Sequence, residues 1–364
     1  MSKIISFASD FGLTDGSVGV VKGVISRIDD SLKVNDISHG IPPQDIKYGS
    51  LLLMRAIQYI PTSRTTKNVK NFLIIPPRIY KITLLILSSE LIIISMSKII
   101  SFASDFGLND GSVGVVKGVI SRIDDSLKVN DISHGIPPQD IKYGSLLLMR
   151  AIQYIPQGVL LAVVDPGVGS DRKAIAITTD WGVMIGPDNG LLNLACATVG
   201  GAQKAYALEN ENWIIPHEGN TFHARDIFAP FAAGYASGQL KLEEFGPELD
   251  LEDLKQYLIP LTDVTDNEIK GEVLYIDEFG NCQTNISPQE LTDKDYKVGD
   301  VIPIKIDNQE LSAKWCETYK NETIGGIGIV IDSWGMASLF LSNGNAQKML
   351  NCKDNSKVII KVSN

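Results

Sequence analysis

The sequence lacks several features that would point to common classes of protein. No cluster of Lys and Arg occurs on a predicted helix face and the net charge is −10, so a nucleic-acid partner is disfavoured. The chain has only four histidines and no HExxH motif, and His217 and His223 lack zinc-ligand spacing. A zinc hydrolase is therefore a remote alternative, and we expect no metal. None of the four cysteines has CxxC spacing, which is typical of reduced thiols and favours the cytoplasm: Cys196, Cys282, Cys316 and Cys352.

A long apolar run is also missing. The run Ile82–Ile94 is interrupted by Glu90 and is shorter than the ~20 residues that span a bilayer. It lies inside the chain and has no small-residue cleavage site, so a signal peptide is disfavoured. Residues 62–95 show neither helical nor strand periodicity, and Pro76-Pro77 breaks them. We interpret them as an aberrant apolar linker, with a membrane anchor as the less favoured alternative. The remaining composition, 44% hydrophobic and 21% charged, is that of an ordinary globular chain.

What the chain does contain is a repeated fragment. Residues 1–61 and 96–156 are identical except for Thr14 against Asn109. Two copies of a fragment are not a solenoid, in which many similar units stack. The first copy stops at Pro61, whereas the second continues directly into the rest of the chain. Copy 1 must reach across 34 extra residues, which lowers its effective concentration, so we expect copy 2 to complete the fold.

The pattern from Met96 onward alternates strands and helices. Strands are predicted at Ile99–Ala103, Val129–Ile132, Val159–Val164, Ala174–Thr178 and Val183–Ile185. Helices are predicted at Ser112–Ile123, Ile141–Ile155, 189–197 and 226–237. After an acidic connector at 243–253, short strands with turn signals follow from about residue 258. We therefore predict an α/β fold. It comprises a partial duplicate (1–61), the linker (62–95), an N-terminal α/β catalytic domain with a central, mostly parallel sheet flanked by helices (96–257), and a smaller C-terminal antiparallel β-barrel or sandwich (258–364).

Three junctions between strands and loops carry candidate chemistry. Asp105 directly follows a buried strand, where ligands of open α/β sheets bind, and it could accept hydrogen bonds from a vicinal diol. Asp110 and Ser112 stand at the next helix start and could face a polar ligand. The alternative is that one of them caps that helix, which we favour for Ser112. The tripeptide Asp-Phe-Gly has no accompanying Gly-rich loop, strand lysine or HRD segment, so it does not indicate a kinase.

The second and third junctions bring two charged groups and an imidazole. In VVDPGVGSDR, a tight glycine loop could place Arg172 next to Asp165 and keep that carboxylate ionised. The alternative is a surface ion pair that contributes little to stability. PGVG lacks the Gly-Lys-Ser/Thr ending of a Walker loop. His223 directly precedes a helix, with Asp226 expected as its cap or first-turn acid and Arg225 as a structural pair. A lone histidine in this position is more often structural. His223 is a catalytic candidate only in combination with Asp165 and Arg172.

The motifs now permit a comparison with a known family. DFGxxDGSVGVVKG, DISHGIPPQDI, VVDPGVGSxR, PDNGLL, TFHxRDIFAP and IDxFGNxxTNI occur in this order. The chain from 96 to 364 thereby resembles the adenosine-forming S-adenosylmethionine hydrolases, or S-adenosylmethionine hydroxide adenosyltransferases, which are related to fluorinase and chlorinase. The resemblance implies that water or hydroxide attacks ribose C5′ in line and expels methionine, leaving adenosine. It also implies a homotrimer with sites between subunits, S-adenosyl-L-methionine as substrate, and no cofactor.

Residue roles follow from the same resemblance. It implies that Asp165, Arg172 and His223 hold and activate the water, either through a true base or by binding preformed hydroxide. It implies that Asp105 binds the ribose hydroxyls. Further substrate contacts are implied at Asp110 and Ser112 (near methionine), Asp277 (the ammonium), Asn281 (the adenine edge), and Asn189, Ser333, Ser338 and Leu341. Two positions depart from the family pattern: Ser338 stands where an acid is expected, and Ala224 replaces a glycine.

Two other functions remain open at this point. A halide could replace water as the nucleophile, but the halogenases of this family lack the Asp–Arg–His set. Alternatively, the N-terminal extension could block trimer assembly and leave a nucleoside-binding or inactive product.

Overall fold

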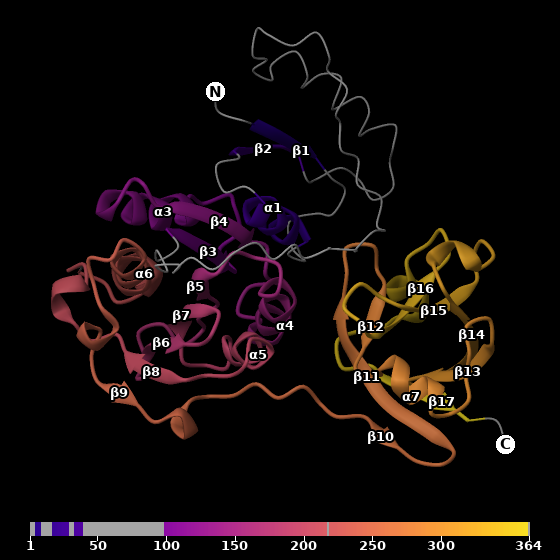
Figure 1. Cartoon of the computed structure of the whole chain (residues 1–364). Coiled ribbons are helices and arrows are strands. Elements are labelled where there is room, and N and C mark those ends of the chain that lie inside the picture. The colour runs from indigo at the N-terminus through magenta and orange to yellow at the C-terminus, as the bar shows by residue number, and fades with distance from the viewer. Residues whose placement is uncertain (1–3, 9–16, 29–32, 39–97, 217, 363–364) are drawn as a thin grey trace, which may run out of the picture.

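The computed structural model describes residues 4–8, 17–28, 33–38, 98–216 and 218–362. The linker at 62–95 and most of the first repeat lie outside these residues, so the expectations for them stay predictions. Figure 1 shows an α/β body and a β-barrel joined by an extended segment. Within the described part of the chain, no helix combines the length and apolar character needed to cross a membrane.

The α/β body is built on one seven-stranded sheet. Its order is β4-β3-β5-β7-β6-β8-β9. The first four strands in this order run parallel, as predicted, whereas β6, β8 and β9 pair antiparallel. The strands are β3 (Ile99–Ser104), β4 (Lys128–Ser133), β5 (Gly158–Val163), β6 (Ala174–Thr178), β7 (Gly182–Pro187), β8 (Lys204–Ala207) and β9 (Glu248–Leu249). Because β9 lies within the predicted acidic connector, that prediction was wrong for residues 248–249, and the extended segment begins after them.

Helices cover both faces of this sheet, which explains the continuous apolar strands. Along β5, Leu161 and Val163 face the core cluster under α3 and α6, whereas Leu160 and Ala162 face the cluster under α4 and α5. The body's helices are α3 (Ser112–Ile123), α4 (Ile141–Ala151), α5 (Asn193–Thr198), the π-helix η3 (Ala224–Phe228) and α6 (Ala229–Ala236), with 3-10 turns η2 (Glu211–Trp213), η4 (Leu242–Glu244) and η5 (Leu251–Asp253).

Several predicted helix bounds were wrong. The helix predicted at 189–197 is Asn193–Thr198, and the one predicted at 226–237 begins as a π-helix at Ala224 and ends at Ala236. Helix α4 ends at Ala151 instead of Ile155, and Asp140 caps its start by accepting a hydrogen bond from the Tyr143 amide at 2.8 Å. Asp226 lies in the first turn of η3, which confirms one of its two predicted positions; it is fully buried there and does not cap the helix, because η3 already begins at Ala224. There it pairs with Arg225 at 2.6 Å, the structural partner expected for that arginine.

The C-terminal body is a closed barrel, which decides between barrel and sandwich. Seven strands close through the pairing of β11 with β17, and β10 extends β11. All pairs are antiparallel except β14 with β15. The strands are β10 (Asp263–Val264), β11 (Glu268–Ile276), β12 (Cys282–Thr284), β13 (Val301–Ile306), β14 (Gln309–Cys316), β15 (Ile327–Ile331), β16 (Ala337–Leu341) and β17 (Lys357–Lys361), with short helices α7 (Pro288–Thr292), η6 (Tyr319–Asn321) and α8 (Ala346–Leu350).

Aromatic and guanidinium contacts join the barrel to α4. The Arg150 guanidinium lies 4.0 Å above the Tyr275 ring and donates to the Gln283 side chain, while the hydroxyls of Tyr143 and Tyr275 are 3.0 Å apart. These contacts fix one edge of the barrel against the α/β body.

The described strands of the first repeat do not join the main sheet. Strands β1 (Ile4–Ala8) and β2 (Lys33–Ser38) make a separate two-stranded parallel sheet beside α1 (Ser17–Ile28). In the main sheet, β3 of the second repeat pairs with β5. The prediction that copy 2 completes the fold is therefore confirmed.

Candidate active site

Asp165 and Arg172 form a buried, two-pronged ion pair at the carboxyl end of β5. Arg172 Nε donates to Asp165 Oδ1 at 3.1 Å and Nη2 donates to Oδ2 at 2.5 Å. The two side chains are only 8% (Arg172) and 6% (Asp165) exposed. The alternative of a surface ion pair is thus wrong, and this fork geometry is among the stronger hydrogen-bonded charge pairs.

His223 completes the cluster from the start of η3. Its Nδ1 lies 2.9 Å from Arg172 Nη2, and its Nε2 lies 2.6 Å from Asn220 Oδ1. A guanidinium can only donate, so Nδ1 accepts and Nε2 carries the proton. The imidazole in this arrangement is neutral, with its tautomer set by two neighbours.

One nitrogen of Arg172 has no hydrogen bond within the described residues. Nη1 is buried and unpaired, while Nε and Nη2 are engaged by the carboxylate and the imidazole. The guanidinium lies 5.4 Å from the centre of the Phe228 ring, which shields it. A buried donor without a partner is costly, so the cluster favours an oxygen ligand at this nitrogen.

Asp105 lies near the same cluster. Its Oδ2 accepts a hydrogen bond from the Gln139 amide at 2.8 Å, and Gln139 adopts a left-handed backbone conformation with φ of 66°. Burial raises the pKa of Asp105, and the negative charge of Asp165 adds to that rise, while the Gln139 amide opposes it.

Asp110 and Asn189 both form hydrogen bonds with backbone groups. Asp110 Oδ1 accepts from the Ser112 amide at 2.9 Å, which lowers the pKa of Asp110 and ties it to the first residue of α3. Asn189 Nδ2 donates to the Val164 carbonyl at 2.8 Å, and its Oδ1 accepts from the Leu191 amide at 3.1 Å. Asn189 therefore fixes the end of β5 directly before Asp165.

The other predicted substrate residues lie on the barrel. Asp277 binds Asn281 in the turn between β11 and β12, through the Asn281 amide and side chain, each at 2.8 Å. Ser338 is buried on β16 beside Gln283 of β12, and Leu341 ends β16. Ser333 is exposed in the turn before β16. These five positions thus lie on or next to the neighbouring strands β11, β12 and β16, whereas Asp165, Arg172 and His223 belong to the α/β body.

Sequence reasoning missed two supporting groups. Asn220, which holds His223, has no signal of its own beyond its place three residues before that histidine. The second group is a set of three hydrogen-bonded side chains. Ser104 Oγ lies 2.8 Å from His134 Nδ1, and His134 Nε2 lies 3.1 Å from Asp131 Oδ1. Ser104 is fully buried, so this set joins the ends of β3 and β4 and is not a nucleophilic site. The quoted motif DISHGIPPQDI already contained two of its members.

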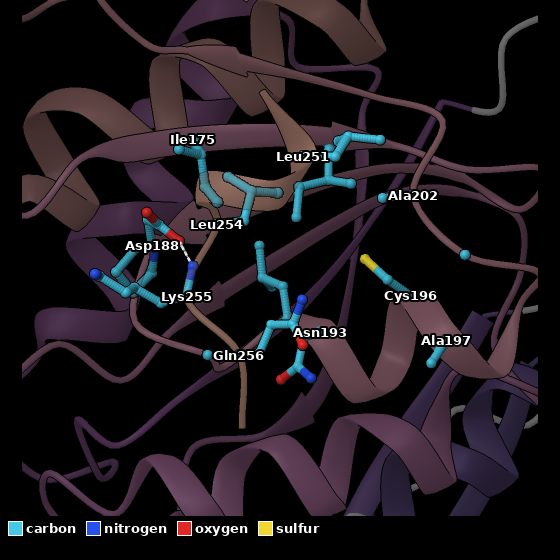
Figure 2. Close-up of a pocket in the computed structure, with 15 residues that line it drawn as sticks. Ile175, Asp188, Asn193, Cys196, Ala197, Ala202, Leu251, Leu254, Lys255 and Gln256 are labelled. Carbon is cyan, nitrogen blue, oxygen red and sulfur yellow. Dashed lines mark hydrogen bonds between the residues drawn. The ribbon is translucent and has the colours of Figure 1, made fainter. Parts of the chain in front are cut away.

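An apolar pocket lies elsewhere in the α/β body. Figure 2 shows it between β6, α5 and residues 251–256, with Asp188 Oδ1 accepting from the Lys255 amide at 2.9 Å. Its lining includes none of the predicted catalytic or substrate residues. In the described residues, no group of three His, Cys, Asp or Glu side chains is arranged to hold a metal ion, and the four cysteines are buried free thiols.

Together, the carboxylate–guanidinium–imidazole cluster at the strand ends and the attached barrel define a two-body α/β and β-barrel protein with an enzyme-like site. The family model described as "SAM hydroxide adenosyltransferase N-terminal domain" matches residues 5–66 and 100–246, and the model of the corresponding C-terminal domain matches residues 271–359. The chain belongs to the S-adenosylmethionine hydroxide adenosyltransferase family, as its motifs predicted.

Individual relatives agree with this assignment. The (R)-S-adenosyl-L-methionine hydrolase of Salinispora tropica is 37% identical over 251 residues, covering 69% of this chain and 93% of the relative. A fluorinase of an Actinoplanes species is 26% identical and covers 53% of this chain and 73% of the relative. A crystal structure of an uncharacterized conserved protein from Thermotoga maritima matches with a TM-score of 0.66 and 31% identity, covering 72% of this chain and 99% of that one.

Proposed function

We propose that this chain hydrolyses S-adenosyl-L-methionine to adenosine and L-methionine. The observation that carries the proposal is the buried Nη1 of Arg172. This cationic nitrogen lies next to Asp165 and His223 and has no hydrogen-bond acceptor among the described residues. Family membership supplies the substrate class, because relatives with 34–37% identity are named (R)-S-adenosyl-L-methionine hydrolases.

The geometry supports a division of labour for in-line attack. Each Asp165 oxygen accepts one hydrogen bond from Arg172 and keeps a second lone pair, which can orient the water and take up its proton. Arg172 Nη1 donates to the water oxygen and stabilises its developing negative charge. The new bond joins that oxygen to C5′, and the electrons of the C5′–S bond remain on sulfur. Methionine therefore leaves as a neutral thioether and needs no general acid.

Substrate binding is shared between the two bodies in this proposal. Asp105 accepts hydrogen bonds from the ribose hydroxyls, and Asp110, Ser112 and Asn189 border the same strand ends. The barrel residues contact the methionine and adenine parts: Asp277, Asn281, Ser333, Ser338 and Leu341. We further propose a homotrimer in which the barrel of one subunit completes the site of the next, action without metal or cofactor, and a cytoplasmic location in keeping with four free thiols.

The test is product formation from S-adenosyl-L-methionine by the full chain, by residues 96–364, and by Asp165→Ala in each. Adenosine and methionine in equal amounts, lost by at least about 100-fold in Asp165→Ala, would support the proposal. Reaction in ¹⁸O-labelled water should place the label on adenosine O5′. A halide-dependent 5′-halogenated product would instead assign the halogenase alternative, and silence of both wild-type chains would contradict the hydrolase.

A further inference from the structure

His134 directly follows β4 and lies beside the end of β3, where the loop with Asp105 begins. Its side chain is only 2% exposed, and its ring meets the ring of Phe102 edge to face, with the two centres 4.6 Å apart. A side chain this deeply buried does not touch a bound substrate. Any role of His134 in the site must therefore act through the residues that it holds.

Both ring nitrogens of His134 have side-chain partners. Nε2 lies 3.1 Å from Asp131 Oδ1, and Nδ1 lies 2.8 Å from Ser104 Oγ. Burial alone would raise the pKa of Asp131, but the hydrogen bond from His134 and the charge of Lys117 lower it. An ionised carboxylate only accepts hydrogen bonds, so Nε2 donates to Asp131 and Nδ1 can accept the Ser104 hydroxyl proton. The ring is thereby fixed from both sides.

The contacts of His134 reach the residues on both sides of Asp105 in the sequence. Ser104 immediately precedes Asp105, and its Oγ also accepts from the Phe106 amide at 3.5 Å. The His134 carbonyl accepts a hydrogen bond from the Gly107 amide at 2.8 Å. The backbone that carries Asp105 is therefore tied to His134 before and after that residue.

The segment that begins with His134 also reaches the carboxylate itself. The Gln139 amide donates to Asp105 Oδ2 at 2.8 Å, and the next residue, Asp140, caps α4. Residues 134–139 thus hold both the backbone around Asp105 and one of its carboxylate oxygens. A carboxylate that binds a vicinal diol must face two hydroxyls at once, so a small rotation weakens the hydrogen bonds to both.

We propose that His134 is a positioning residue for recognition of the ribose. By holding Ser104 and Gly107, it sets the direction in which the Asp105 carboxylate meets the two ribose hydroxyls. This inference rests on the role proposed above for Asp105. Ser104 is fully buried, so it is a link between His134 and the loop and not a substrate ligand. The effect of His134 is confined to ligands that carry the diol.

Adenosine and 2′,3′-dideoxyadenosine measure this recognition, because they differ only in the two ribose hydroxyls. Calorimetric titration of the full chain should give a dissociation constant at least about tenfold lower for adenosine, as expected for hydroxyls bound to a charged acceptor. Asp105→Ala should abolish this preference. Ser104→Ala removes the partner of His134 Nδ1 and leaves Asp105 in place. It should reduce the preference to about a third or less, while the affinity for the dideoxy compound changes less than about twofold.

Ser101→Ala is the matched control. Ser101 is a fully buried serine of the same strand, and its Oγ accepts from Asn130 of β4 at 3.5 Å. Its removal deletes the same atom and a bond between the same two strands, but away from Asp105, so the preference should stay at the wild-type value. Thermal unfolding of each variant reports whether it is folded.

Two substitutions of His134 provide a second, independent comparison. The side-chain amide of asparagine can take the place of Nδ1 and keep the bond to Ser104, whereas that of glutamine takes the place of Nε2 and keeps only the bond to Asp131. His134→Asn should therefore retain more of the preference for adenosine than His134→Gln does.

The outcomes separate this inference from the proposed reaction. Full preference in Ser104→Ala or His134→Gln, with loss in Asp105→Ala, would overturn the inference and leave the proposed function intact. A parallel loss of affinity for both nucleosides would also overturn it, because a purely structural histidine gives that result. A wild-type chain that shows no preference, or binds neither nucleoside, would contradict the role of Asp105 and the inference with it. A chain that prefers adenosine but releases none from S-adenosyl-L-methionine would contradict the hydrolase and keep the role of His134.

Discussion

Gly169, in the loop after Asp165, closely approaches the carbonyl of Asn220, three residues before His223. A Cβ atom at Gly169 would lie 2.8 Å from the Asn220 carbonyl oxygen, and Gly169 has a left-handed φ of 79°. Both facts require glycine. This contact holds the carboxylate–guanidinium pair and the imidazole at a fixed separation.

Gly169→Ala should therefore lower both stability and activity. The strained backbone costs about 1–3 kcal/mol, and the added methyl pushes the two segments apart. Gly167→Ala is the matched control, because the atoms nearest to its Cβ would be side-chain atoms of Ser170 and Arg172, at 3.4 Å or more. Thermal unfolding and adenosine release measure the two effects. Equal behaviour of the two variants would contradict the structural role of the contact.

Asn220→Ala should lower kcat roughly tenfold and leave KM nearly unchanged, as expected for a residue that positions His223 without touching substrate. Without Asn220 Oδ1, the imidazole loses the partner that keeps its proton on Nε2. Asn220→Ser, which restores a hydrogen-bond acceptor, should recover part of the rate. The pH profile of kcat should shift in Asn220→Ala, whereas an unchanged profile would show that Asn220 does not set the tautomer.

Arg172→Lys should reduce kcat by about 10²–10³-fold although the positive charge is kept. Lysine offers a point charge and cannot reproduce the fork to Asp165, the bond to His223 and the free Nη1 donor together. The exposed Arg122 at the end of α3 provides a control, since Arg122→Lys should leave the rate unchanged. Near wild-type activity in Arg172→Lys would leave only a charge requirement at this position.

Asp105 should make substrate binding sensitive to acid at a higher pH than an ordinary aspartate would. Its pKa is raised by burial and by Asp165, so its carboxylate is protonated earlier as the pH falls, and KM should rise there. The same pKa shift has the opposite effect on the stability of the fold, which is favoured at low pH. A carboxyl whose pKa is raised by folding favours the folded state when neutral, so that contribution is lost as pH rises from the unfolded value through the raised one.

Asp105→Asn separates the two effects. The amide is neutral at all pH values, so KM should be high throughout, while the melting temperature at neutral pH should equal or exceed that of the wild type. Kinetics and thermal unfolding from pH 4 to pH 8 provide the measurements. A melting temperature that falls at neutral pH would show that the ionised Asp105 stabilises the fold instead.

The alternation of strands and helices was readable from the sequence because burial on two faces imposes a distinct residue pattern. Ser112–Ile123 and Ala174–Thr178 were predicted with their observed bounds. The short strands β8 and β9 were missed, since four and two residues are too few to show periodicity. The antiparallel direction of β6 also has no local signature, because direction depends on where the chain turns.

By itself, the sequence determined the fold class, the family and the three chemical groups of the cluster, because each depends on local pattern or on ordered motifs. Only the tertiary structure decided that the pair of Asp165 and Arg172 is buried, that Asn220 holds His223, and that one Arg172 nitrogen lacks a partner in the described residues. It also decided the surroundings of two identical helices: α1 lies against Ile132 and Ile155 of the second repeat, whereas α3 buries one face in the core of the α/β body. Identical sequences share local structure, but burial and partners are set by segments far away along the chain.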